Sequence, residues 1–160
     1  MRPDFDELDF SWLVVQQVTP HIRARCSGTS AVVVSSTTID YRSLARHLVS
    51  GEDHVIEIGS SLGHCTEILH ARAADVLGLD VSVAQLVESR SRLPGVAFEF
   101  LDIFQEQDRL ASFPQALRCN QVFLDIGGDR AKGCLDFPFS TYRRSCTASV
   151  SCDAASKKQD

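Results

Sequence analysis

Residues 55–64 read Val55-Ile56-Glu57-Ile58-Gly59-Ser60-Ser61-Leu62-Gly63-His64. The first four are an apolar run interrupted by one acid, which predicts a short buried strand. The two glycines allow a tight turn and a close approach of the backbone to a ligand. A strand that ends in such a turn and opens a helix is typical of open parallel sheets, in which ligands bind at the carboxyl ends of the strands.

Three more apolar segments follow, and helical patterns separate them. Strands are expected at residues 76–80, 96–101 and 121–126, and helices at about residues 65–72 and 107–113. Ser82 and Gln85 form a capping-box pattern that predicts another helix, ending near Arg92. Strands that alternate with helices predict an α/β fold with a doubly wound parallel sheet and right-handed crossovers.

Residues 1–39 are expected to form an N-terminal extension or cap. A short helix that ends before Pro20 is predicted by apolar residues at helical spacing, namely Leu8, Trp12, Val15 and Val18. Residues 31–34 are a β-branched run and predict an extended segment. A helix with one apolar face is then expected, with Asp40 as its N-cap and Gly51 as its stop.

The composition is that of an ordinary globular domain. The chain has 160 residues, of which 44% are hydrophobic and 23% charged, and its net charge of -5 gives no global basic footprint for nucleic acid. No apolar run is long enough to span a bilayer, and acids near the start argue against a secretory signal. We therefore expect an intracellular, cytoplasmic protein without a membrane partner.

The cysteines do not suggest a metal site. None of the 6 forms a C-x-x-C pair. No metal ligands are expected, and the thiols are interpreted as reduced core or tail residues.

Glu57 and three aspartates lie at or near the carboxyl ends of the four expected strands. Asp80 lies about 20 residues beyond Gly59, a separation at which a carboxylate can bind ribose hydroxyls. Asp102 and Asp125 end the next two strands. A nicotinamide dinucleotide would favour G-x-G-x-x-G and a helix N-terminus facing its pyrophosphate. An acid such as Glu57 beside the turn suits an ammonium and a sulfonium group better than a phosphate.

The pattern Glu57-x-Gly59-x-x-x-Gly63 resembles motif I of the class I S-adenosylmethionine-dependent methyltransferases, which have a Rossmann-like fold. The resemblance extends from about Tyr41 to Gly128 and implies the strand order 3-2-1-4 for the strands present. The frequent middle glycine of the motif is Ser61 here. The segment after strand four lacks the Asn/Asp-Pro-Pro-aromatic motif of amino-methylating enzymes, which disfavours adenine, cytosine or glutamine N-methylation.

The resemblance implies S-adenosylmethionine as the cofactor and assigns a role to each site residue. The methionine end would be held by Glu57 and the turn of Gly59, Ser60, Ser61 and Gly63. The ribose would be held by Asp80, with Val81 beside it. The adenine would be recognised by Asp102 and the backbone at Ile103. Asp125 and Ile126 would face the methyl group and an unidentified acceptor.

Methyl transfer needs no protein nucleophile, and needs a base only when the acceptor must lose a proton. Asp125 is the preferred catalytic residue, with His64 and Asp129 as other candidates near the mouth of the site. The alternative role for Asp125 is to cap the turn of Gly127 and Gly128. Tyr41 is a candidate lid residue.

The C-terminal part departs from the family. No strand is evident after the fourth, so the domain is expected at residues 40–135 and a disordered tail at 136–160. Strand four would then be an exposed edge in an apparently truncated sheet, open to a partner chain or a second copy. Two alternatives remain: a degenerate module that binds a cofactor or partner without catalysis, and a NAD-dependent oxidoreductase.

Overall fold

The computed structural model describes residues 14–19, 22–27, 30–35, 37–125 and 147–151. The described strands are β1 (Val14–Thr19), β2 (Ile22–Ser27), β3 (Ser30–Ser35), β4 (His54–Ile58), β5 (Asp75–Asp80), β6 (Ala97–Phe100), β7 (Gln121–Asp125) and β8 (Thr147–Ser151). The described helices are α1 (Thr38–Leu48), α2 (His64–His70), α3 (Val83–Arg92), α4 (Gln107–Leu110) and the 3-10 helix η1 (Pro114–Leu117).

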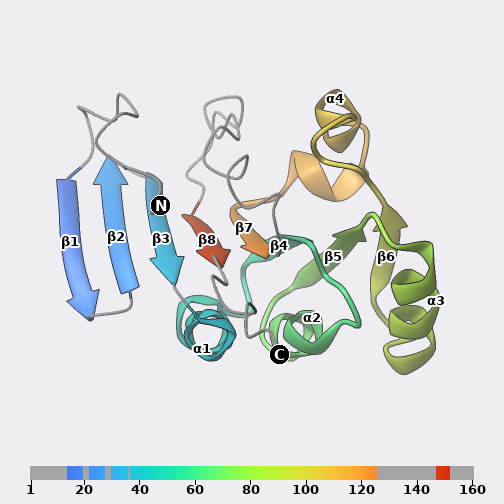
Figure 1. Ribbon diagram of the computed structural model, residues 1–160, viewed down its shortest axis with the longest axis horizontal. Helices are drawn as coiled ribbons and strands as arrows, with labels where there is room; N and C mark the ends of the chain where they lie inside the picture. Colours follow the sequence, from blue (N-terminus) through green and yellow to red (C-terminus); the bar gives the residue numbers. More distant parts are fainter. Residues whose placement is uncertain (1–13, 20–21, 28–29, 36, 126–146, 152–160) are drawn as a thin grey trace, which may run out of the picture.

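All described strands join one sheet of 8 strands in the order β1-β2-β3-β8-β7-β4-β5-β6 (Figure 1). The segment β6-β5-β4-β7 is parallel throughout and confirms the predicted order 3-2-1-4. Its central strands β4, β5 and β7 are buried along most of their length, as strands covered on both faces must be.

Two apolar clusters cover the two faces of this parallel segment. One contains Tyr41 and Leu44 of α1, Leu69 of α2 and Leu86 of α3, packed on alternate strand residues that include Phe123. The other packs Leu110 of α4 and Ala116 of η1 against the opposite face. Because side chains alternate along a strand, Glu57 shares the face of Val55 and therefore points toward the layer of α1 and α2.

Helices α2 and α3 lie where helices are predicted, α4 is shorter than the predicted 107–113, and α1 ends at Leu48 rather than at Gly51. Ser82 is the N-cap of α3, and its hydroxyl accepts a hydrogen bond from the Gln85 N–H, as the capping pattern predicts. The N-cap of α1 is Thr37, whose hydroxyl oxygen accepts from the Asp40 N–H at 3.1 Å. The prediction of Asp40 as the cap is therefore wrong, and Asp40 lies in the first turn, where an acid suits the helix dipole.

The expectation for the N-terminal residues is partly wrong. Residues 14–19 form β1, which pairs antiparallel with β2, and β2 pairs antiparallel with β3. The short helix predicted through Val15 and Val18 does not exist there, because residues 14–19 pair with β2 instead, and this non-local pairing outweighs the local helical spacing. The extended segment at residues 31–34 is confirmed as part of β3.

The sheet also does not stop at the fourth predicted strand. β8, within the expected tail, lies between β7 and β3 and is parallel to both (Figure 1). The prediction of an exposed β7 edge in a sheet truncated there is therefore wrong, and the physical reason for a partner chain at that edge is removed. Residues 126–146 and 152–160 of the predicted C-terminal region lie outside the described residues.

No helix in the described part of the chain has both the length and the hydropathy needed to cross a membrane.

Candidate functional site

The turn between β4 and α2 has a left-handed backbone at three positions. Gly59 has φ 84°, Ser61 φ 50° and Gly63 φ 79°. Glycine adopts these angles without strain, whereas Ser61 adopts its angle at an energetic cost. The left-handed Gly63 is the N-cap of α2. The chain thus changes direction sharply at the carboxyl end of β4, as the sequence predicts.

Hydrogen bonds within the protein hold this turn in place. The N–H groups of Gly59 and Ser60 both donate to the Leu79 carbonyl oxygen, at 2.8 and 3.0 Å. The Gly63 N–H donates to the Ser60 carbonyl oxygen at 2.8 Å. The Ser61 N–H donates to Asp80 Oδ2 at 2.8 Å. These four N–H groups are therefore engaged internally, unlike those of a phosphate-binding turn.

Asp80 ties the turn to the end of β5. Its second carboxylate oxygen, Oδ1, accepts from the Ser82 N–H at 2.8 Å, and the side chain is 8% exposed. Two backbone donors thus fix the orientation of the carboxylate. Each oxygen keeps a lone pair, so Asp80 retains the capacity to accept hydrogen bonds from a diol.

Glu57 lies beneath the turn as a buried acid, with 1% of its surface exposed. The Thr66 hydroxyl donates to Oε2, and the Tyr41 hydroxyl donates to Oε1 at 3.5 Å. Burial raises the pKa of Glu57 to about 8; the Thr66 hydrogen bond opposes this rise, and the nearby charge of Asp125 adds to it. A cation brought beside this carboxyl would favour its ionised form.

Tyr41 is not placed as a lid. Its side chain is fully buried, and its ring contacts Phe123 edge-on at a centroid distance of 5.6 Å. Burial, followed by the charge of Glu57, raises the pKa of Tyr41 well above its ordinary value, so the hydroxyl stays protonated and acts as a donor. The helix α1 therefore contributes a hydrogen bond to the floor of the site.

The hydroxyl group of Ser60 is buried and makes no hydrogen bond to the described part of the protein. The side chain is 4% exposed, and Oγ has no hydrogen-bond partner among the described residues. Buried hydroxyls are usually satisfied, so an unsatisfied one at a glycine turn indicates a group that a ligand or water would engage.

The remaining predicted cofactor residues lie after β5 and β6. Val81 is 46% exposed at the surface. Asp102 is half-buried, and its Oδ1 accepts from the Phe104 N–H at 3.1 Å. The side chain of Ile103 belongs to the second apolar cluster, so only its backbone is suited to reading an adenine edge.

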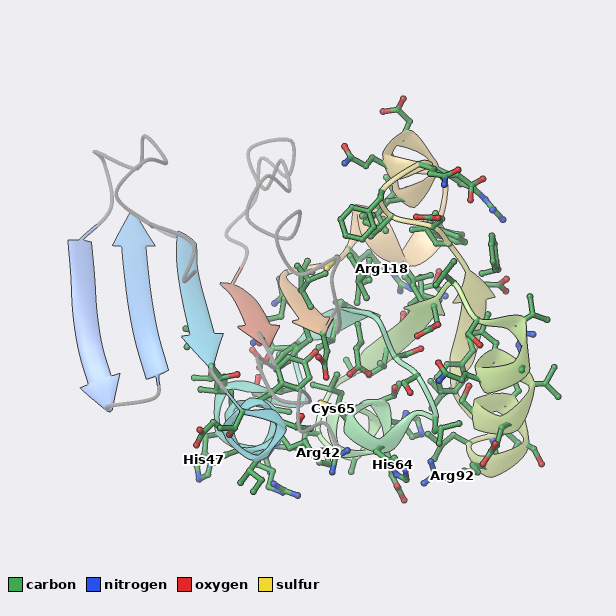
Figure 2. The ribbon with its side chains drawn as sticks, in the orientation of Figure 1. Arg42, His47, His64, Cys65, Arg92 and Arg118 are labelled. Carbon is green, nitrogen blue, oxygen red and sulfur yellow. The ribbon has the colours of Figure 1, made fainter. Side chains whose placement is uncertain are left out.

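Asp125 is half-buried at the carboxyl end of β7, on the same sheet face as Glu57, and its register partner on β8 is Ser151. Its predicted alternative as a cap for residues 127 and 128 falls outside the described residues, as do Ile126 and Asp129. His64 is exposed, and Figure 2 shows it on the outer side of α2. The structure thus does not bring His64 toward the strand ends.

Arg92 of α3 contacts the turn, and no sequence pattern predicts this role. One guanidinium nitrogen donates to the Leu62 carbonyl oxygen, and the other donates to Glu67 Oε2 at 3.2 Å. Figure 2 shows Arg92 between α2 and α3. Thr66 was also missed; its place in the first turn of the helix that follows the glycine turn is the signal that could have put it near the end of β4.

Within the described ranges, no group of three or more His, Cys, Asp or Glu side chains is arranged to hold a metal ion. The site is instead a row of carboxylates along the carboxyl ends of four parallel strands, with an internally bonded turn at its centre. Such a site favours a ligand that carries hydroxyl donors and positive charge over a dinucleotide phosphate.

Part of the chain is similar in sequence to curated proteins. No protein-family model matches the chain. A curated trans-aconitate 2-methyltransferase of Methylobacterium nodulans is 47% identical over 62 residues, covering 38% of this chain and 24% of that protein. The protein of the same name from Paracidovorax citrulli is 36% identical over 87 residues, covering 53% of this chain and 34% of its own. The chain thus spans about a quarter to a third of these relatives.

Among solved structures, an S-adenosylmethionine-dependent methyltransferase from Mesorhizobium loti aligns with a TM-score of 0.43 and 23% identity, covering 59% of this chain and 42% of that one. The sequence relatives and the parallel sheet confirm the resemblance of the described core to the class I S-adenosylmethionine-dependent methyltransferases. The roles of individual site residues stay predictions.

Proposed function

We propose that this chain, whose parallel sheet is that of a class I methyltransferase, binds S-adenosylmethionine and takes part in methyl transfer to an acceptor. The observation that carries the proposal is the bond from the Ser61 N–H to Asp80, with the buried Glu57 beneath the same turn. This arrangement joins a diol acceptor and a cation acceptor at one glycine turn, where four N–H groups are already bonded within the protein.

The described residues fit this cofactor. Asp80 has acceptor capacity for the ribose hydroxyls, and the unpartnered Ser60 Oγ can bond the methionine end. Glu57 offers the negative charge that an ammonium group needs. Asp102 and the Ile103 backbone would recognise the adenine. The cofactor, when bound, supplies an electrophilic methyl group on a positive sulfur.

The protein's own contribution is binding, alignment and exclusion of water. Asp125 ends β7 on the same face as Glu57, so we assign it to the acceptor side. There it would orient the acceptor or take a proton from it, if the acceptor carries one. An acceptor that is already ionised, such as a carboxylate, would need no proton removal, and groups other than a charged Asp125 would have to orient it, because two carboxylates repel each other.

The acceptor to test first is trans-aconitate, because the curated relatives carry the name trans-aconitate 2-methyltransferase. The chain covers only part of those relatives, so this acceptor belongs to the proposal. We place the activity inside the cell, in the cytoplasm, where the cofactor is made.

The test begins with calorimetric titration of the chain with S-adenosylmethionine, S-adenosylhomocysteine and NAD. We expect both adenosyl ligands to bind and NAD not to bind. Asp80→Asn should abolish binding, whereas Asp75→Asn should not, because Asp75 lies at the opposite end of the same strand and pairs with Arg118 at the surface. Failure of a folded chain to bind either adenosyl ligand would refute the proposal.

Methyl transfer is then measured by mass spectrometry of trans-aconitate incubated with the chain and S-adenosylmethionine. Addition of one methyl group supports the enzyme. Cofactor binding without transfer to any acid in a broad panel would favour the second candidate, a cofactor-binding module without catalysis. This candidate is tested because the chain covers only part of its relatives.

A further inference from the structure

The carboxyl group of Glu57 is held by two hydroxyl groups from two different helices. Thr66 of α2 donates to Oε2. Tyr41 of α1 donates to Oε1 at 3.5 Å, a long contact that leaves this oxygen with accepting capacity for a stronger donor. With the side chain 1% exposed, water supplies little of the solvation that an ionised carboxylate requires.

In the part of the chain that the structure describes, no cation is paired with this acid. From the sheet, its register neighbours are Gly78 and Phe123, which carry no charge. Helix α2 contributes the Cys65 thiol, and β7 contributes Asp125, whose charge repels that of Glu57. Helix α1 contributes Tyr41 and also Arg42, whose charge acts on Cys65. None of the ion pairs among the described residues involves Glu57.

A buried carboxyl with hydroxyl donors and no cation is neutral in the empty site and charged once a cation arrives. We propose that Tyr41, Thr66 and Glu57 form a proton-coupled receptor for the ammonium group of the cofactor, in which Glu57 holds a proton when the site is empty and releases it to solvent on binding. This inference rests on the proposed function. Burial raises the pKa of Glu57 to about 8, and this value sets the pH range over which binding releases a proton.

Tyr41 and Thr66 are positioning residues in this receptor. Both hydroxyls stabilise the ionised form of Glu57 more than the neutral form, because a carboxylate is the stronger acceptor. Asp125 acts in the opposite sense, because its negative charge disfavours a second one nearby. Removing either hydroxyl should therefore raise the pH at which Glu57 loses its proton, and removing the charge of Asp125 should lower it.

The experiment is calorimetric titration at about pH 6.5, where an α-amino group is charged, in two buffers of different ionisation enthalpy. The probes are S-adenosylhomocysteine, which has the ammonium group without the sulfonium charge, and 5′-methylthioadenosine, which lacks the amino-acid part. We expect release of about one proton with the first probe and none with the second. Equal release with both, or none with either, would overturn the receptor.

The variants add a directional test. In the wild type, affinity for S-adenosylhomocysteine should rise about tenfold per pH unit between about pH 5.5 and 7, and in Glu57→Gln it should be flat. Tyr41→Phe and Thr66→Val should move the plateau of affinity to higher pH, and Asp125→Asn to lower pH. A purely structural role would lower affinity equally at every pH, which would contradict the proposal.

A measurement without turnover separates this inference from the proposed function. The infrared spectrum of the ligand-free protein should contain a protonated carboxyl band that is absent in Glu57→Gln and that S-adenosylhomocysteine removes. Binding without loss of this band would overturn the receptor and leave the cofactor assignment standing. Absence of binding by both probes to folded protein would overturn the proposed function, and the receptor with it.

Discussion

The ring of Phe98 on β6 fills the space that a side chain on Gly78 of β5 would need. A Cβ atom on Gly78 would lie 2.5 Å from Cδ1 of Phe98, and one on Gly63 would lie 3.2 Å from Cζ of the same ring. One buried ring therefore packs against both the strand before Asp80 and the glycine turn. The position of the turn depends on the absence of side chains at these two glycines.

Gly78→Ala should destabilise the fold. The ring of Phe98 is 2% exposed and has little room to move, so the added methyl group forces a shift that costs about 1–3 kcal/mol. Gly95→Ala is the matched control, because the nearest atom to its Cβ is 3.7 Å away, and it should change the free energy of unfolding by less than about 0.5 kcal/mol. Urea unfolding measures both, and equal effects would refute this account of the packing.

Arg92→Lys should weaken cofactor binding more than it weakens the fold. Lysine cannot bond the Leu62 carbonyl and Glu67 together with the planar geometry of a guanidinium, so the turn loses its brace. We expect S-adenosylhomocysteine affinity to fall by roughly threefold to tenfold, which corresponds to the loss of about one hydrogen bond. Arg109→Lys, at an exposed pair on α4, should leave the affinity unchanged.

Glu57→Gln should stabilise the ligand-free protein at alkaline pH. Because burial raises the folded pKa of Glu57 from 4.5 to about 8, its contribution is full below about pH 4.5 and is lost as the pH rises toward 8. The wild type should therefore lose stability across this range relative to Glu57→Gln. Denaturant titrations at several pH values measure the difference, with the exposed Glu88→Gln as control. Parallel curves for wild type and Glu57→Gln would contradict a buried, neutral Glu57.

Asp53→Asn should reduce the acid sensitivity of the fold. Burial tends to raise the pKa of Asp53, but bonds from the Ser50 N–H at 2.7 Å, the Ser50 hydroxyl at 2.8 Å and Asn120 Nδ2 at 2.9 Å outweigh it and lower the pKa. This stabilisation is present above the unfolded value of about 4 and is lost as the pH falls through the lower folded value.

Acid unfolding followed by circular dichroism tests the role of Asp53. The wild type should lose stability below about pH 4 more steeply than Asp53→Asn. Asp108→Asn, on the exposed face of α4, should follow the wild type. If all three proteins unfold in parallel, the network around Asn120 does not hold a charged Asp53.

The parallel core was predictable because its signals are local. The strands β4, β5 and β7 are apolar runs that end in a glycine turn or an acid, and a strand buried on both faces requires such runs. The cap at Ser82 was also predictable, since the residues that form it are three positions apart. The acids at the strand ends follow from the same pattern, because parallel strands place their carboxyl ends on one edge.

The antiparallel pair of β1 and β2 was not predicted, and neither was β8, for different reasons. In β2, Ile22, Ala24 and Cys26 alternate with two arginines, a period-two signal that could have indicated a strand. The segment 147–151 contains one large apolar residue, Val150, and is a strand through pairing with β7 and β3 on either side. That pairing is non-local, so no local pattern reports it.

The contacts that buried side chains make beneath the glycine turn could also not be predicted from the sequence. The family resemblance implies Tyr41 as a lid residue, because the segment before the glycine turn often covers the cofactor in that family. Its burial beneath Glu57 follows from the packing of α1 against β7, where Phe123 meets its ring. Spacing places a residue on a helix face, but packing decides which neighbour that face meets.

The place of β8 in the sheet sets an order of assembly. As the chain leaves the ribosome, β1, β2 and β3 emerge first, yet the strand that joins them to the parallel core is residues 147–151. A nascent chain that has reached Asp125 can pair β4, β5, β6 and β7, but it has no strand to bridge β7 and β3. The antiparallel strands β1, β2 and β3 can join the parallel core only after β8 has been synthesised. Until then β3 and β7 both have an unpaired edge, at which the nascent chain can mispair.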